Sequence, residues 1–283
     1  MTNGTLYIVA LPIGHRRDIT YRAVDILRAV DLIAAEDTRD FRAIARDWEI
    51  ATPVVSYHDH NEQSRAPELI ERLLGGASVA LVSDAGTPLV NDPGFRIVGA
   101  AIDAGIEVTS VPGASAVTTS LAAAGLPVAP FVYLGFPPRT GGKRRSFFAP
   151  WLRTPATLVF FEAPHRLIAC LEDVLTAGGD RPACLARNLT KPHERYQRGM
   201  ISELIVQLRA EGEVRGEVTV LVAGSADAEP EQPEDAASIV AEMLTQGLDS
   251  RTILERLTNE YGMKRRAAYE LILRVRNEGL SGE

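Results

Sequence analysis

The stretch Ser83-Asp84-Ala85-Gly86-Thr87-Pro88-Leu89-Val90-Asn91-Asp92-Pro93-Gly94 decides the fold of this chain. It follows the apolar run Ser78–Ser83 and precedes an amphipathic pattern, Phe95–Ala104, that ends before Gly105. A strand, a turn of small residues and a helix form one unit of an α/β fold. Ligands bind such folds outside the carboxyl ends of the strands, so we expect this long turn to shape a ligand site.

The same unit recurs along the first half of the chain. Near-continuous apolar runs are typical of strands whose two faces are both covered by helices. The other expected strands are Thr5–Leu11, Leu32–Ala35, Val54–Tyr57 and Glu107–Val111, and the other expected helices are Thr20–Val30, Glu68–Leu74 and Ser115–Ala124. This pattern predicts an N-terminal α/β domain, residues 1–127, with a mainly parallel sheet.

A second series of elements begins after the proline-rich crossing Pro127 to Pro130. Its expected strands are Phe131–Phe136, Thr157–Phe161, Ala183–Arg187, Arg195–Met200 and Val218–Ala223, and its expected helices are Arg166–Thr176 and Ser202–Arg209. The segment between Arg187 and Arg195 is too short for a crossover helix, so the second sheet is expected to be mixed. These residues, 128–224, form the second predicted α/β domain.

The rest of the chain differs in composition. Ser225–Pro233 is acidic and contains prolines, which is typical of a linker, and we place that linker at residues 225–235. Three amphipathic patterns follow, at Ala236–Gln246, Arg251–Tyr261 and Lys264–Asn277. They predict a small helical module over residues 236–283, so the expected fold class is α/β with two domains and a helical appendage.

The composition is that of a globular protein, with 46% hydrophobic and 24% charged residues among 283. No apolar run approaches the roughly 18 residues that cross a membrane, and the N-terminus lacks a signal-peptide pattern. We therefore expect a cytoplasmic protein that makes no use of a membrane. Cys170 and Cys184 are too few for a disulfide framework and are expected to be buried.

The net charge of −7 argues against nucleic-acid binding over the whole surface. Basic residues are nevertheless concentrated in Arg139–Arg153, which contains no acidic residue and includes Phe147, Phe148 and Trp151 as possible stacking faces. The segment is either an RNA-binding loop or a solvated basic loop. Candidate RNA contacts across the chain are Arg39, His60, Arg139, Lys143, Arg144, Arg145, Arg166, Lys264 and Arg265.

Four turns after N-terminal strands contain glycine, proline or small polar residues: Leu11–Gly14, Glu36–Arg39, Ser83–Pro88 and Pro112–Ser115. The glycine and proline of any one of these turns are explained by the need for a tight turn. Four such turns after strands of the same sheet indicate a ligand site. The Gly-x-Gly-x-x-Gly fingerprint and the Walker phosphate loop are both missing from the sequence. Their absence argues against ordinary nicotinamide enzymes and nucleoside-triphosphate enzymes.

An ordered set of motifs resembles the ribosomal RNA small-subunit methyltransferase I family of tetrapyrrole methylases. The motifs are Ile8–Gly14 with Asp18–Thr20, Ala35–Arg39, Ser83–Gly94, Val111–Ser115, Phe160–Arg166 and Leu189–Glu194. The resemblance spans about Gly4 to Gly224 and includes a helical tail. It implies a homodimer that uses S-adenosyl-L-methionine, bound between the two α/β domains, to methylate the 2′-hydroxyl of a decoding-centre cytidine in 16S rRNA of the small ribosomal subunit.

By the same resemblance, the cofactor-binding residues are Pro12, Gly14, Asp84, Gly86, Thr87, Pro88, Ser115, Ala116 and Ala163. The chain departs from the family pattern at two places, where Leu11 and Asn188 replace a threonine and a glutamate. Both positions are interpreted as supporting ones. Two alternatives stay open: a C-methyltransferase of tetrapyrroles, and a non-catalytic RNA-binding factor of ribosome assembly.

A 2′-hydroxyl is a poor nucleophile, so a base is expected near the methyl group. The catalytic candidates are Glu162, Lys191 and Glu194. Two of them have an alternative role, because Glu162 could simply pair with Arg166 and Lys191 is also suited to a phosphate contact. Further acceptors on cleft turns are Glu36, Asp37, His58, His60, Glu62 and His165. His58 and His60 point to opposite sides of an extended segment, so no metal site is expected there.

Overall fold

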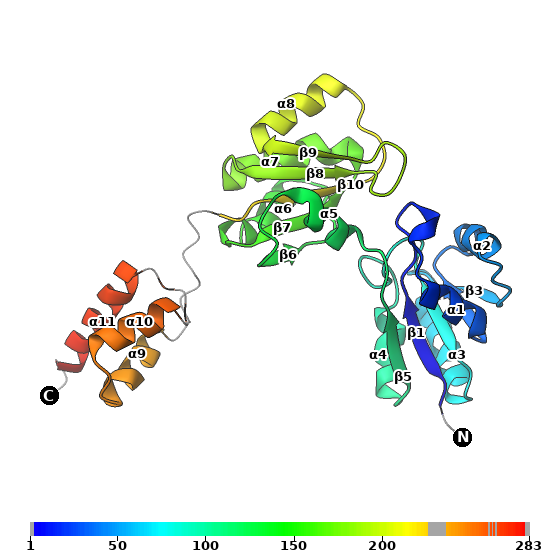
Figure 1. The fold of residues 1–283 in the computed structure, drawn as a ribbon, viewed down its shortest axis with the longest axis horizontal. Helices are drawn as coiled ribbons and strands as arrows, with labels where there is room; N and C mark the ends of the chain where they lie inside the picture. The colour runs from blue at the N-terminus through cyan, green and yellow to red at the C-terminus, as the bar shows by residue number, and fades with distance from the viewer. Residues whose placement is uncertain (1–2, 226–235, 260, 262, 264, 281–283) are drawn as a thin grey trace.

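The computed structural model describes residues 3–225, 236–259, 261, 263 and 265–280, with side chains as far as Arg276. In these ranges the chain forms two five-stranded sheets and a separate group of helices at the C-terminal end (Figure 1). The predicted fold class is confirmed. None of the described helices is long and apolar enough to cross a membrane.

The first sheet is entirely parallel, with the strand order β3-β2-β4-β1-β5. Its strands are β1 (Thr5–Val9), β2 (Leu32–Ala35), β3 (Val54–Ser56), β4 (Val79–Val82) and β5 (Glu107–Val111). Every residue of β2 and β4 is buried, because helices cover both faces of the sheet. This burial is the physical reason for the continuous apolar runs in the sequence.

Four helices cover this sheet: α1 (Tyr21–Ala29), α2 (Thr38–Asp47), α3 (Glu62–Leu74) and α4 (Phe95–Asp103). Residues of α1 and α2 pack on one face, and residues of α3 and α4 pack on the other. Two expectations need correction. The segment from Thr38 starts a helix capped by Asp37, whereas we expected only a turn, and α3 begins six residues before its predicted start.

The second sheet has the order β6-β7-β10-β8-β9 and is mixed, as predicted. Its strands are β6 (Phe131–Tyr133), β7 (Thr157–Glu162), β8 (Pro182–Arg187), β9 (Arg195–Met200) and β10 (Val218–Val222). Only the pair β6 and β7 is parallel, and the other neighbours run antiparallel. Side chains alternate between the two faces of this sheet, so neighbouring residues of one strand meet different helices.

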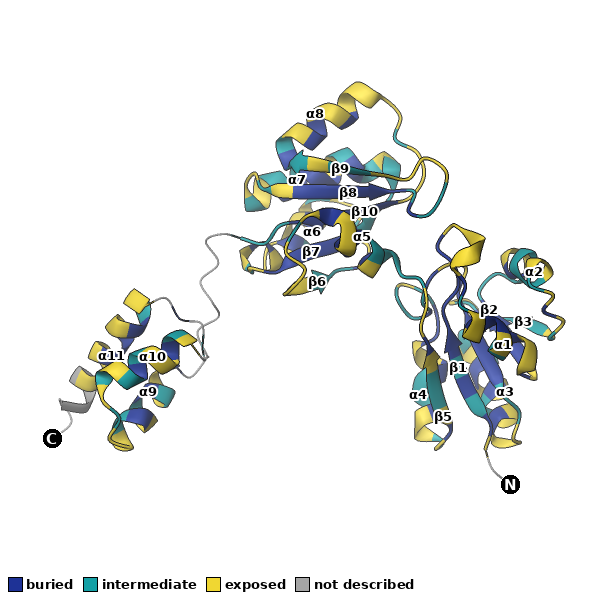
Figure 2. Cartoon of the chain, in the orientation of Figure 1, coloured by how far each residue is buried: buried dark blue, intermediate teal, exposed yellow. Residues whose placement is uncertain are grey.

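Three helices, α6 (Gly141–Phe148), α7 (Leu167–Gly178) and α8 (Ile201–Glu211), pack on one face of the second sheet. Figure 2 shows exposed residues along the outer side of α8 and buried residues along β8. The opposite face is covered by α5 (Ala116–Ala124), which follows β5 in the chain. The domain boundary expected after residue 127 assigns α5 to the first domain. In the structure, however, α5 packs on the second sheet.

The basic segment Arg139–Arg153 is not the loop that we expected. It contains α6 and a short 3₁₀ helix, η2 (Trp151–Arg153). Phe148 is completely buried, with its ring 4.9 Å from the ring of Phe160, so it offers no stacking face to RNA. The helix is held to the domain by this aromatic anchor. The prediction that Cys170 and Cys184 are buried is confirmed.

The C-terminal module consists of α9 (Ala236–Thr245), α10 (Ser250–Asn259) and α11 (Arg265–Leu280). Apolar side chains of the three helices form a core of their own, which includes Val240, Leu257 and Ile272. The expected linker at 225–235 lies outside the described residues, except for Ser225.

Candidate functional site

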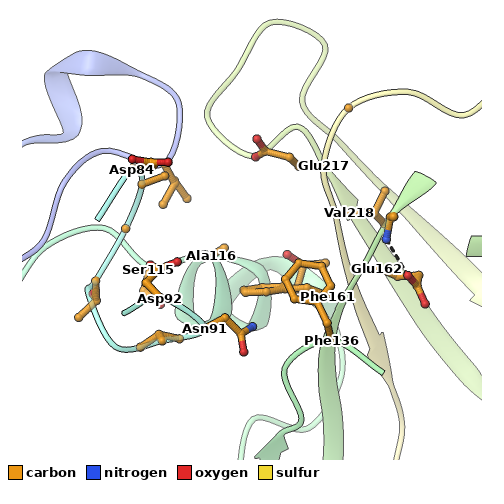
Figure 3. Close-up of a pocket in the computed structure, with 18 of the residues that line it drawn as sticks. Asp84, Asn91, Asp92, Ser115, Ala116, Phe136, Phe161, Glu162, Glu217 and Val218 are labelled. Atoms are coloured by element: carbon orange, nitrogen blue, oxygen red, sulfur yellow. Dashed lines mark hydrogen bonds between the residues drawn. The ribbon is translucent and has the colours of Figure 1, made fainter. Parts of the chain in front are cut away.

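A cavity of about 450 Å³ opens between the two sheets (Figure 3). It lies at the carboxyl ends of β1, β2 and β4, where the sequence predicted a ligand site. The second sheet contributes the ends of β6 and β7 and the start of β10. The lining residues are Ile13, Glu36, Asp84–Thr87, Val90–Asp92, Ser115, Ala116, Phe136, Phe161–Pro164 and Gly216–Thr219.

The long turn after β4 is fixed by a backbone pairing with the first turn of the chain. Leu11 N donates to Gly86 O at 2.8 Å, and Gly86 N donates to Leu11 O at 3.0 Å. Gly86 has a φ of +75°, which side-chain-bearing residues rarely adopt. Leu89 and Asn91 also have positive φ angles, so the turn holds a strained shape against the cavity.

Three carboxylates lie on the cavity wall formed by the first domain. Burial, together with the nearby charges of Asp84 and Asp92, raises the pKa of Glu36 to about 7. Burial likewise raises the pKa of Asp92 to about 6 and raises that of Asp84. Asp84 N donates to Glu36 Oε2 at 3.4 Å. Such a crowded set of partly buried carboxylates favours a cationic ligand.

The start of α5, which also lines the cavity, favours an anionic group rather than a cationic one. Ser115 stands at the N-cap of this helix, and its side chain makes no capping hydrogen bond. The first N–H groups of an α-helix have no partner within the helix and attract anions. The cavity therefore presents an acidic wall and an anion-binding helix end, which together suit a ligand that carries both charges.

The second domain supplies an aromatic wall. The ring of Phe161 lies 5.3 Å from the ring of Tyr133 and 5.5 Å from the ring of Phe136, both in edge contacts. Asn91 Nδ2, from the first domain, donates to the Tyr133 hydroxyl at 2.5 Å. In Figure 3 Phe136 and Phe161 face Asp84, Asn91 and Asp92 across the cavity.

Six of the predicted cofactor residues line this cavity: Asp84, Gly86, Thr87, Ser115, Ala116 and Ala163. The other three, Pro12, Gly14 and Pro88, do not line it, and both prolines are buried. Gly14 instead packs against the connection between β8 and β9, where an added Cβ would lie 2.4 Å from Lys191 Cγ. The small residue at position 14 is thus required by contact between the domains.

The structure places the carboxylate of Glu162 away from the cavity, as Figure 3 shows. Glu162 Oε1 lies 2.5 Å from Arg166 and accepts a hydrogen bond from Ala163 N at 2.7 Å. The side chain is completely buried, so it cannot receive a proton from a substrate in the cavity. This pairing argues against the expected catalytic role of Glu162, although the residue is one of those that line the cavity.

The other two catalytic candidates lie beside the cavity rather than in it. Lys191 Nζ lies 2.5 Å from Glu217 Oε1, and Glu217 lines the cavity. Glu194 Oε2 accepts a hydrogen bond from Thr190 N at 2.5 Å, which braces the connection between β8 and β9. Among the further acceptors that the sequence suggested, the side chain that lines the cavity is Glu36.

Sequence reasoning missed Asp92, Phe136 and Glu217 as lining residues. Asp92 lies in the turn from Ser83 to Gly94, so its position in the sequence was a usable signal. Phe136 is the last residue of one predicted strand, and Glu217 comes just before another. The neighbouring sequence does not distinguish either of them from an ordinary surface residue.

The candidate RNA contacts fall into two groups. Arg144 is buried and lies 2.5 Å from Asp173, so its expected RNA contact is wrong; Arg166 is likewise paired with Glu162. The exposed ones are Arg39, His60, Arg139, Lys143, Arg145 and Arg265, of which Arg39 pairs with Asp37 and Arg145 with Asp173. Lys264 lies outside the described residues. Within the described part of the chain, no cluster of side chains could hold a metal ion.

Comparison with known proteins decides the family. Residues 5–205 match the family described as Tetrapyrrole (Corrin/Porphyrin) Methylases. The ribosomal RNA small subunit methyltransferase I of Micromonospora olivasterospora is 48% identical over 271 residues, which cover 95% of this chain and 87% of that protein. The protein of the same name from Streptococcus pyogenes serotype M1 is 42% identical over 95% of this chain and 94% of its own length. The chain belongs to the ribosomal RNA small subunit methyltransferase I family.

Solved structures agree on the fold of this tetrapyrrole methylase. The uroporphyrin-III C-methyl transferase from Thermus thermophilus, complexed with S-adenyl homocysteine, superimposes with a TM-score of 0.55. The match covers 77% of this methyltransferase chain and 97% of that one at 22% identity, so it shows the fold alone. The resemblance inferred from the sequence motifs is confirmed.

Proposed function

We propose that this chain transfers a methyl group to the ribose 2′-hydroxyl of a decoding-centre cytidine in 16S rRNA. S-adenosyl-L-methionine is the methyl donor. The observation that carries the proposal is the cavity between the sheets, which combines an acidic wall with an uncapped helix N-terminus. The names of the relatives, which describe small-subunit rRNA methyltransferases, support the class of substrate.

The charges of the cavity match those of the donor. Its ammonium and sulfonium groups are positive and suit the carboxylates of Asp84 and Asp92, whereas its carboxylate suits the N–H groups at Ser115 and Ala116. Small residues on both walls, among them Gly86 and Ala163, leave room for a ligand to approach the backbone closely.

The reaction requires a proton acceptor in the cavity, and Glu36 is the residue that we assign to it. When bound, the donor supplies an electrophilic methyl group on its sulfonium. The ribose oxygen forms a bond to the methyl carbon while the carbon–sulfur bond breaks, and its electron pair stays on sulfur. Glu36 accepts the hydroxyl proton, for which a pKa of about 7 is well suited near neutral pH.

The proposal also covers the compartment, the oligomeric state and the RNA contacts of the enzyme. It acts in the cytoplasm, where small ribosomal subunits are available, and works as a homodimer whose two domains in each chain enclose one cofactor. The exposed basic residues Arg139 and Lys143 contact RNA phosphates.

The decisive experiment is methyl transfer from labelled S-adenosyl-L-methionine to small subunits isolated from cells that lack this protein, followed by mapping of the labelled nucleotide. We expect label on the ribose of one decoding-centre cytidine. Cofactor binding without transfer to the subunits would contradict the proposal, and so would label on a base.

A matched pair of variants tests the base. Glu36→Gln should lower kcat by about 100-fold or more while the fold is retained. Glu71→Gln, on the exposed side of α3, should leave kcat unchanged. Equal activity of the two variants would remove Glu36 from the mechanism.

A further inference from the structure

Phe136 combines two properties that rarely occur together. Its side chain lines the cavity, and yet the residue is 55% exposed. A large aromatic residue that lines a cavity and keeps this much surface open has a ring face to offer an entering ligand.

The ring is nevertheless held firmly. It makes an edge contact with Phe161, and Phe161 N donates to Gly135 O at 2.9 Å, which fixes the backbone just before Phe136. Gly135 has a φ of +64°, and an added Cβ would lie 2.7 Å from Asn91 Oδ1, so the chain here is tightly seated against the first domain. The exposed ring is therefore presented by a rigid support, which lowers the entropic cost of stacking on it.

The charges around Phe136 indicate which way a nucleotide enters. Asp84 and Asp92 lie across the cavity from Phe136, as Figure 3 shows, and Glu36 also lines the cavity. These carboxylates repel phosphate. The chain beyond Phe136 leads to Arg139 and Lys143, whose exposed side chains have no acidic partner among the described residues. Phosphates are thus favoured outside the cavity, and the uncharged base and ribose are favoured inside.

We propose that the ring of Phe136 is the stacking platform for the base of the target nucleotide, which leaves its neighbours and enters the cavity beside the cofactor. The inference rests on the proposed function and adds to it a residue that positions the substrate. Unstacked bases of single-stranded RNA are commonly held on aromatic side chains, and enzymes that modify nucleotides extrude their targets in this way. In this proposal the cofactor lies against Asp84 and Ser115, which line the same cavity as Phe136.

The test compares methylation kinetics on small subunits with the Kd of S-adenosyl-L-methionine measured by calorimetry. Phe136→Ala and Phe136→Leu should each lower kcat/KM by about 10-fold to 100-fold, because loss of a base–aromatic stack has this magnitude. Phe136→Tyr keeps the aromatic face and should stay within about threefold of the wild type. Phe131→Ala is the matched control, since Phe131 is an exposed aromatic residue of the same segment that does not line the cavity.

We expect the Kd of the cofactor to be unchanged in all four variants. A Kd that weakens in proportion to the activity of Phe136→Ala would show that the ring contacts the cofactor, and overturn the inference. Wild-type activity of Phe136→Leu would overturn it as well, because that variant keeps the apolar volume without the aromatic face. If Phe136→Ala fails to fold in a thermal melt, the leucine and tyrosine variants decide the question. A wild-type protein that methylates no subunit would overturn the proposed function itself.

Discussion

Glu162 and Arg166 form a buried ion pair with a separation of 2.5 Å on the α7 side of the second sheet. The same Glu162 oxygen accepts the N–H of Ala163, which lines the cavity on the other side. The pair therefore fixes the turn that forms one wall of the cavity. We therefore expect Glu162 to position this turn rather than to accept a proton from the substrate.

Glu162→Gln should lower the free energy of unfolding by about 3 kcal/mol, because removal of one partner leaves the other charge buried. It should also weaken cofactor binding more than it lowers kcat. Glu255→Gln is the control, since the exposed pair of Arg251 and Glu255 has the same spacing in the chain and should contribute less than about 1 kcal/mol. Urea denaturation and calorimetry give both quantities. A large loss of kcat at unchanged stability would restore a catalytic role to Glu162.

Glu36→Gln should change the pH dependence of stability. The folded state binds the Glu36 proton more tightly than the unfolded chain, because the pKa rises from 4.5 to about 7 on folding. The wild-type protein therefore loses stability as pH rises between these values, and the glutamine variant lacks this contribution. Thermal melts without cofactor should show similar Tm values near pH 4.5 and a higher Tm for the variant at pH 8. A difference that stays constant with pH would contradict the assignment.

Two glycines between α8 and β10 form a matched pair for substitution. Gly216 has a φ of +90°, and an added Cβ would lie 1.8 Å from Asn188 Oδ1. Gly212 has a φ of +79° and no atom within 4 Å of an added Cβ. Gly212→Ala should destabilise the protein by about 1–2 kcal/mol through its backbone alone, and Gly216→Ala by a further 1–3 kcal/mol or so through the clash. Only Gly216→Ala should weaken cofactor binding, because Gly216 lines the cavity; equal effects would contradict the clash.

Neighbouring basic residues of α6 should behave differently. Arg144 is buried, pairs with Asp173 and donates to Ala169 O at 3.0 Å, so Arg144→Ala should destabilise the protein by about 3 kcal/mol. Lys143 is exposed, so Lys143→Ala should leave the Tm unchanged. It should weaken subunit binding and reduce its salt dependence, which filter binding at several salt concentrations measures. Unaltered binding would remove Lys143 from the RNA surface.

The two sheets could be predicted because their signals are local. The continuous apolar runs of β2 and β4 require burial on both sides, and the short connection between β8 and β9 leaves no room for a crossover helix. The sequence of α6 favours a loop, because Gly141 and Gly142 disfavour a helix and its charges are typical of a solvated segment. Only the packing of Phe148 against Phe160 provides the contact that stabilises it.

The sequence by itself determined the class of fold, the order of strands and turns along the chain, and the unusual turn from Ser83 to Gly94, part of which lines the cavity. These features follow from the periodicity of apolar residues and from the backbone freedom of glycine, both of which depend on residues close together in the chain. The tertiary structure alone decided that α5 covers the second sheet, that Glu36 faces the cavity and that Glu162 faces α7. The alternation of side chains along β7 is visible in the sequence, but which face meets the cavity depends on contacts between segments far apart in the chain.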